Sequence, residues 1–188
     1  MEKIMDLSEK LCAEHIYLRF LSKEDTESML QLQLENRDFF EQFAPERDEE
    51  YYTLEEQQKR LETFKESAKK DNDYYFGLFL NESDELIGTI NLFAIMRGSI
   101  QSAYVGYFLD KKHNGKGYMT EAVQLIVAYA FEELKLHRVE AGVMPHNLGS
   151  IRVLEKAGFE REGLNRKNVK INGKWEDHVH LAIVNPND

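Results

Sequence analysis

The segment from His113 to Thr120 combines residue types that could bind an anionic group. It reads His-Asn-Gly-Lys-Gly-Tyr-Met-Thr, it follows an apolar run over 103–109, and it precedes a long helical pattern. The first amides of a helix have no partners inside the helix, and the helix dipole adds about half a positive charge there. Glycines let the backbone come close to a phosphate. We therefore expect a phosphorylated ligand at this loop.

The loop by itself does not name the ligand. It lacks the third glycine of a dinucleotide fingerprint and the Gly-Lys-Ser/Thr ending of a P-loop. Asn-Gly and Gly-Lys-Gly are also typical of a plain surface turn. Other segments of the chain decide between these two interpretations.

Composition places the chain among soluble globular proteins. Its 188 residues are enough for one domain with a core, at 42% hydrophobic and 31% charged residues. No apolar run approaches the roughly 20 residues of a membrane span, and residues 1–6 lack the basic start and apolar centre of a signal peptide. The single cysteine, Cys12, excludes an intramolecular disulfide. We expect a cytoplasmic enzyme or binding protein without a membrane partner.

The charge balance is strongly acidic. There are 34 acidic and 24 basic side chains, which gives a formal charge of −10. Such a field repels nucleic acid and attracts cations, so we expect no direct nucleic-acid binding. The charge serves solubility in the simplest interpretation. The alternative is a cationic substrate, namely a basic peptide, a polyamine or an aminoglycoside.

The elements that must position the loop follow from periodicity and turn signals. Ser22 with Asp25, and Thr53 with Glu56, are helix-start signatures, and Asn172-Gly173 is a hairpin signal. The predicted helices cover 23–36, 54–70, 119–134 and 148–157. The predicted strands cover 15–21, 74–80, 86–96, 101–109 and 138–143, followed by two strands that flank the hairpin turn. This order predicts a mixed sheet with a parallel pair and a right-handed crossover, in an α/β or α+β domain.

A second segment, from Val143 to Phe159, resembles a conserved stretch of the GNAT acetyltransferases. Its form, Asn-x-x-Ser followed by Leu-Glu-Lys-x-Gly-Phe, is similar to the RimJ/RimL branch, as is the ending over 162–179. That branch acetylates N-terminal alanines of ribosomal proteins. The resemblance covers roughly residues 12–185 and implies a single N-acetyltransferase domain over 1–188. It also implies the GNAT fold, with a mixed central sheet of about seven strands, four helices and a parallel pair splayed for acetyl-CoA.

The resemblance implies acetyl-CoA as the donor and no metal. The family's diphosphate-loop pattern, Arg/Gln-x-x-Gly-x-Gly/Ala, maps onto 114–119, with departures at Asn114 and Met119. Backbone amides of the loop are expected to face the diphosphate, and the pantetheine arm is expected to enter the splayed gap. The cofactor-binding residues that follow are Phe108, Leu109, Asn114, Gly115, Lys116, Gly117, Tyr118, Met119, Thr120, Asn147, Ser150 and Ile151.

Two residues are candidates for catalysis. An amine must lose its proton, attack the thioester carbonyl and expel a thiolate, while a backbone N–H on the strand over 105–109 stabilises the oxyanion. Ser150 stands where RimL-type relatives place a serine that protonates the thiolate. Its alternative role is to cap the helix that begins at 148, and Asn147 has the same alternative. The second candidate, Tyr104, stands where many family members carry a glutamate base.

No inherited carboxylate base is evident in the chain. Tyr104 replaces the glutamate of the central strand, and Val169 is the nearest match to the glutamate of the penultimate strand. An α-amine with a pKa of about 7.7–8.0 is partly neutral near pH 7, whereas a lysine-like amine near about 10.4 is almost wholly protonated. A chain without such a base therefore favours an N-terminal α-amine, deprotonated through water.

The histidines and one aromatic cluster have simpler interpretations. His178 and His180, two apart beside Asp177, could ligate a metal, but no third ligand is evident and we expect structural roles. His113 and His146 flank the two motifs, where they could shuttle protons or serve as exposed or capping residues. The aromatic cluster could form a wall of the acceptor site, although core packing is its simpler role. It consists of Phe39, Phe40 and Phe43.

Three functions stay open at this point. The first is an acetyl-CoA-dependent N-acetyltransferase that modifies the N-terminal α-amine of a ribosomal protein. The second is an acetyltransferase for a small cationic amine, such as a polyamine or an aminoglycoside, which would need a closed, acidic pocket. The third is a catalytically silent acetyl-CoA-binding module. Family members are often dimers, so a homodimer is a further expectation from the resemblance.

Overall fold

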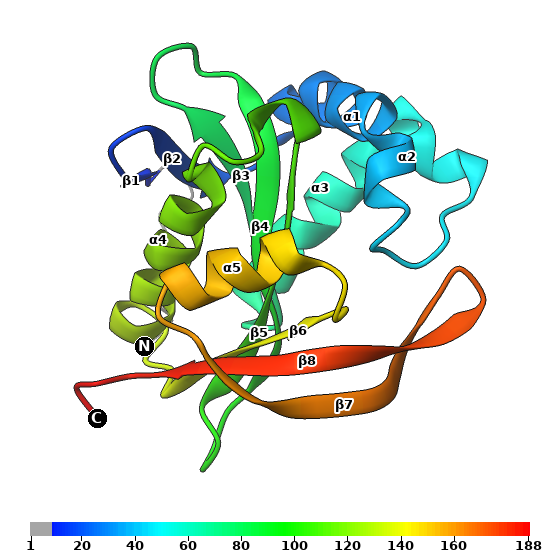
Figure 1. Ribbon diagram of the computed structural model, residues 1–188. Helices are drawn as coiled ribbons and strands as arrows, with labels where there is room; N and C mark the ends of the chain where they lie inside the picture. Colours follow the sequence, from blue (N-terminus) through cyan, green and yellow to red (C-terminus); the bar gives the residue numbers. More distant parts are fainter. Residues whose placement is uncertain (1–8) are drawn as a thin grey trace.

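The strands of the computed structural model, which describes residues 9–188, form one eight-stranded mixed sheet in the order β1-β2-β3-β4-β5-β6-β8-β7 (Figure 1). The strands are β1 (Leu11–Cys12), β2 (Ile16–Phe20), β3 (Tyr74–Leu80), β4 (Leu86–Met96), β5 (Ser102–Leu109), β6 (Arg138–Val143), β7 (Glu160–Ile171) and β8 (Lys174–Val184). Among the described strands, only β5 and β6 pair in parallel, as predicted for the crossover in the middle of the chain. Residues 1–8, which include the start of the chain used above for localisation, lie outside the described residues.

Helices cover both faces of the sheet. They are α1 (Thr26–Glu35), α2 (Arg37–Phe40), α3 (Leu54–Lys69), α4 (Tyr118–Glu132) and α5 (Leu148–Lys156), with 3₁₀ turns η1 (Lys23–Asp25), η2 (Glu49–Tyr52) and η3 (Lys111–His113). Figure 1 shows α4 and α5 together in front of the sheet, while α1, α2 and α3 form a separate group. Within residues 9–188, no helix has the length and apolar character needed to cross a membrane.

Alternation along the strands divides the apolar residues between the two layers. Leu18 of β2 is fully buried in the cluster that contains Ile126 of α4, whereas its neighbour Tyr17 packs in a second cluster with Met29 of α1. This division follows from the period of two along a strand. The sheet is therefore buried on both faces, and its middle strands are held rigidly between helical layers.

The predicted fold class is confirmed, and the numbers of strands and helices are each larger by one. The additional strand is β1, whose two residues pair with β2 and are too few to produce a sequence pattern. The additional helix arises because the region predicted as one helix over 23–36 begins with η1, continues as α1 and is followed by the short α2. The other predicted elements end within two residues of the observed ones.

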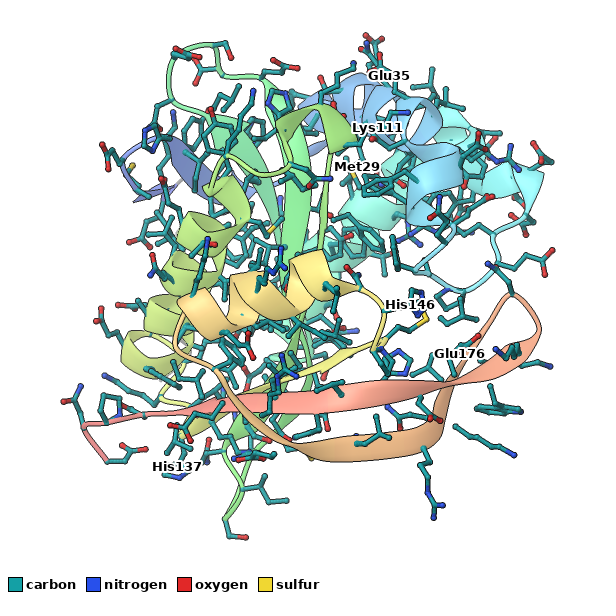
Figure 2. All side chains as sticks on the ribbon, viewed as in Figure 1. Met29, Glu35, Lys111, His137, His146 and Glu176 are labelled. Carbon is teal, nitrogen blue, oxygen red and sulfur yellow. The ribbon has the colours of Figure 1, made fainter. Side chains whose placement is uncertain are left out.

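The side chain of Asn36 explains why α1 ends where it does. It is 1% exposed, and its amide nitrogen donates to the carbonyl of Leu32 at 3.1 Å. Asparagine competes in this way with the backbone hydrogen bonds of a helix. Its amide oxygen accepts from the backbone N–H of Lys111 at 3.0 Å. Asn36 therefore fixes the end of α1 against the loop that follows β5, near the labelled Lys111 in Figure 2.

Packing of α4 on the sheet should dominate the stability of the protein. Ile126 is fully buried on α4, whereas Gln124, two residues earlier, is exposed. We expect Ile126→Ala to lower the free energy of unfolding by about 3 kcal/mol, because it leaves a cavity between helix and sheet. Gln124→Ala, the control on the same helix, should change it by less than about 0.5 kcal/mol. Urea unfolding measures both, and a loss below about 1 kcal/mol for Ile126→Ala would contradict the described core.

Candidate active site

The parallel strands β5 and β6 separate after three paired positions. Their register runs Ser102↔Arg138, Ala103↔Val139 and Tyr104↔Glu140, and no pairing follows. Each strand keeps its other neighbour beyond that point, since β5 pairs with β4 as far as Leu109 and β6 pairs with β8 as far as Val143. The rest of the sheet therefore holds open a gap that begins beyond Tyr104 and Glu140, as the resemblance implied.

The loop after β5 ends at the N-terminus of α4. Gly117 is the N-cap of this helix, with φ of 85° and no side-chain cap hydrogen bond, and Glu121 donates the first intrahelical bond back to Gly117. The amides of Tyr118, Met119 and Thr120 thus precede the first i to i−4 bond. Together with the helix dipole they form a site for an anion, because the N-cap offers no side-chain oxygen to occupy it.

The start of α5 lies across the gap from β5. Asn147 caps this helix, since its amide oxygen accepts from the backbone N–H of Ser150 at 3.2 Å. The hydroxyl of Ser150 shares a hydrogen bond of 2.8 Å with the hydroxyl of Tyr107 on β5. Burial raises the pKa of Tyr107 far above its usual range, so this phenol is neutral and can act as a hydrogen-bond donor. Ser150 is therefore held by both the cap and the tyrosine.

A cavity of about 610 Å³ connects the gap, the loop and the start of α5. Most of the residues predicted to bind the donor lie on its wall. They are Phe108, Leu109, Asn114, Gly115, Gly117, Tyr118, Met119, Thr120, Asn147 and Ser150. The geometry thus brings the two sequence motifs together in one continuous space.

Three predicted site residues lie outside the cavity wall. Ile151 is 2% exposed and packs in the core beneath α5. Lys116 is exposed, with its ammonium 5.9 Å from the centre of the Tyr118 ring. Tyr104 lies against His180, with ring centres 6.1 Å apart. Burial and the nearby Glu140 raise the pKa of Tyr104. Tyr104 and Ser150 are therefore not brought together at this wall.

The face of the sheet away from α5 is opened by two glycines. Gly106 on β5 and Gly142 on β6 each lie two residues beyond the last paired position, and both line the cavity. Phe39 and Phe43, from α2 and the turn after it, form an aromatic wall on this side. The centre of the His146 ring lies 6.1 Å from the centre of the Phe43 ring. A second reactant can therefore approach the gap from the face opposite α5.

Among the described residues of the cavity wall, four with polar side chains are not predicted as site residues from the sequence. Tyr107 on β5 has no role in the sequence prediction, and Arg152 and Lys156 on α5 lie one turn apart facing the cavity. His178 on β8 was expected to be structural. A helical wheel of α5 could have indicated the two cations, whereas His178 depends on strand pairing that no local pattern reveals. Within residues 9–188 no group of three or more metal-ligating side chains occurs.

Comparisons with known proteins agree with this geometry. The family description "acetyltransferase (GNAT) domain" matches residues 15–160. The chain is 64% identical over 173 residues to "Probable N-acetyltransferase YjcK" of Bacillus subtilis, covering 92% of this chain and 96% of that protein. It is 34% identical over 177 residues to the "[Ribosomal protein uS5]-alanine N-acetyltransferase" of Escherichia coli, covering 94% and 91%.

A solved structure provides the same comparison in three dimensions. Mycobacterium smegmatis RimJ in complex with CoA-disulfide is similar with a TM-score of 0.87 and 25% identity, covering 92% of this chain and 83% of that one. The splayed strands, the uncapped helix start and the cavity between them fit acetyl-CoA, the co-substrate of this family. The chain therefore belongs to the GNAT family of acetyl-CoA-dependent N-acetyltransferases.

Proposed function

We propose that this enzyme acetylates the N-terminal α-amine of a ribosomal protein. The named activity of the uS5-alanine relative supports a protein acceptor, since the similarity extends over nearly the whole of both chains. The formal charge of −10 supports an acceptor that carries positive charge.

The character of the cavity wall is the observation that favours an α-amine. Among the described residues that line the cavity, none is Asp or Glu. A polyamine or a lysine-like amine with a pKa near about 10.4 would need a carboxylate to bind it and to take its proton. An α-amine near about 7.7–8.0 needs less help, because part of it is already neutral at pH 7. The aromatic wall of Phe39 and Phe43 suits a short uncharged side chain next to that amine.

For the donor, we infer that the loop after β5 binds the diphosphate. The amides of Gly115, Gly117 and the first turn of α4 supply hydrogen bonds, and Lys116 adds positive charge nearby. Arg152 and Lys156 of α5 add two cations along the same cavity. This arrangement places positive charge on the donor side of an otherwise acidic protein.

The chemical step then uses groups on either side of the gap. The amine nitrogen loses one proton to water or to a basic side chain as it bonds to the acetyl carbon, and a backbone N–H of β5 over 105–109 stabilises the oxyanion. The C–S bond breaks, and the Ser150 hydroxyl gives its proton to the departing thiolate, which otherwise leaves poorly. Tyr107 lies 2.8 Å from that hydroxyl and can return a proton to it, itself regaining one from solvent.

The donor assignment predicts a specific effect of Gly117→Ala. Gly117 has φ of 85° and Gly98, in the turn between β4 and β5, has φ of 72°, and open space surrounds both. Alanine in this conformation should lower the free energy of unfolding by about 1 kcal/mol at either position. Only the methyl at 117 would meet the diphosphate, so Gly117→Ala should weaken CoA binding about 10-fold while Gly98→Ala leaves it unchanged. Calorimetric titration measures this, and equal affinities for the two variants would refute the assignment.

The acceptor assignment predicts a preference between two amines. With acetyl-CoA, we expect thiol release with a basic peptide that begins with alanine to exceed release with spermidine at least 10-fold in kcat/KM. The same peptide with a blocked α-amine should not react, and this control excludes acetylation of its lysine side chains. Ser150→Ala should lower kcat on the peptide by about 100-fold with CoA affinity retained, because general acid catalysis contributes on this scale.

Each contrary outcome of this assay has a defined meaning. Turnover on spermidine alone would replace the protein acceptor by a small cationic amine, which the acidic charge also accommodates. Tight CoA binding without turnover on any amine would indicate a silent binding module. An unchanged kcat for Ser150→Ala would contradict a proton-donor role for Ser150 and leave it only a structural role at the start of α5.

A further inference from the structure

His178 lies on the acceptor face of the gap, where the predicted catalytic residue Tyr104 does not reach the cavity wall. Its side chain is 8% exposed and forms part of the cavity wall. The ring lies over Gly142, such that a Cβ at that glycine would be 3.7 Å from the imidazole carbon Cδ2. The imidazole of His178 on β8 therefore lies next to Gly142 of the splayed strand β6.

One hydrogen bond fixes the tautomer of this imidazole. Nδ1 of His178 lies 3.2 Å from the backbone carbonyl oxygen of Glu176, a residue labelled on β8 in Figure 2. A carbonyl oxygen only accepts, so Nδ1 carries the hydrogen in the neutral ring. Nε2 is then the nitrogen with the free lone pair, which is the orientation that makes a histidine a base.

No described group competes for that lone pair. Among residues 9–188, Nε2 of His178 has neither a hydrogen bond nor an ion pair. The neighbours on β8 are otherwise engaged, since Glu176 pairs with Lys174, and His180 pairs with Glu140 of β6 and Glu162 of β7. Across from His178, β7 contributes the uncharged Asn165, and α2 with its following turn contributes only phenylalanines to the cavity wall.

The other histidines near the site are less suitable. His180 uses Nε2 to contact Glu140 at 2.8 Å and does not line the cavity. His146 is exposed beside the aromatic wall, and His113 lies outside the cavity wall near Glu85. His178 alone among these combines a place on the wall with an unoccupied nitrogen.

We propose that His178 is the general base of the acetyl transfer. The amine loses one proton to Nε2 as its nitrogen bonds to the acetyl carbon, and solvent later removes that proton from the ring. The C–S bond breaks, and the thiolate is protonated by the Ser150 hydroxyl on the opposite face of the gap. The proton lost by the amine and the proton gained by sulfur thus travel by separate routes. This role holds for any amine acceptor and does not depend on a ribosomal protein as the substrate.

The variant His178→Asn tests this role directly. Its amide nitrogen can still donate to the carbonyl of Glu176, but nothing replaces Nε2. With whichever amine the wild-type enzyme acetylates, we expect kcat to fall about 100-fold while CoA affinity and Tm stay near their wild-type values. A general base must be unprotonated to accept a proton, so wild-type kcat should fall at acidic pH and reach a plateau at higher pH. For His178→Asn, kcat should rise continuously with pH and reach no plateau.

A matched control is available two residues along the same strand. His180→Asn removes an imidazole from the same face of β8 but not from the cavity, and its kcat should stay within about threefold of the wild type. A wild-type-like pH profile for His178→Asn, or an equal loss in both variants, would overturn the proposal.

A measurement on the unaltered enzyme covers the case in which the variant fails to fold. Saturating peptides that begin with alanine and with β-alanine differ in the basicity of the attacked amine. If the base is on the enzyme, the acid limb of kcat falls at the same pH for both peptides. An acid limb that moves with the amine would contradict a base at His178.

Discussion

The separation of β5 from β6 is the constraint on which the site depends. Only three positions pair, and beyond them each strand is held by its outer neighbour, β4 or β8. Backbone amides and carbonyls inside a sheet are costly to leave without partners. A ligand that carries its own amides, as the pantetheine arm does, can take the place of the missing strand. On this view, binding of the donor completes the sheet.

The same gap also separates the two kinds of chemistry. The uncapped start of α4 and the cations of α5 lie on one side, where a diphosphate would be stabilised. The other side carries two glycines, an aromatic wall and His178, with no carboxylate among the described residues that line it. The proposed acid, Ser150, and the proposed base, His178, therefore lie on opposite faces of the sheet. The net charge of −10 would then act on the approach of the proposed cationic acceptor rather than on the chemical step.

Local sequence patterns predicted the elements well because strands, helices and caps depend on near neighbours. The capping role of Asn147 and the approximate ends of most elements could be read from the chain. The break between α1 and α2 at Asn36 could not be predicted from the chain, because Asn36 is held by a hydrogen bond from Lys111, 75 positions away. The place of His178 on the cavity wall could not be predicted for the same reason, because it depends on the pairing of β8 with β6. Site residues defined by backbone atoms follow from local motifs, whereas those defined by long-range pairing require the fold.

Amide hydrogen exchange along β5, with and without CoA, would test most directly whether the donor completes the sheet. The amides over 105–109 that are not bonded to β4 should exchange at least about 10-fold more slowly when CoA is bound, because new hydrogen bonds protect them. The amides over 102–104, where β5 already pairs with β6, should not change. Unchanged exchange over 105–109 in a protein that demonstrably binds CoA would contradict a donor seated between the two strands.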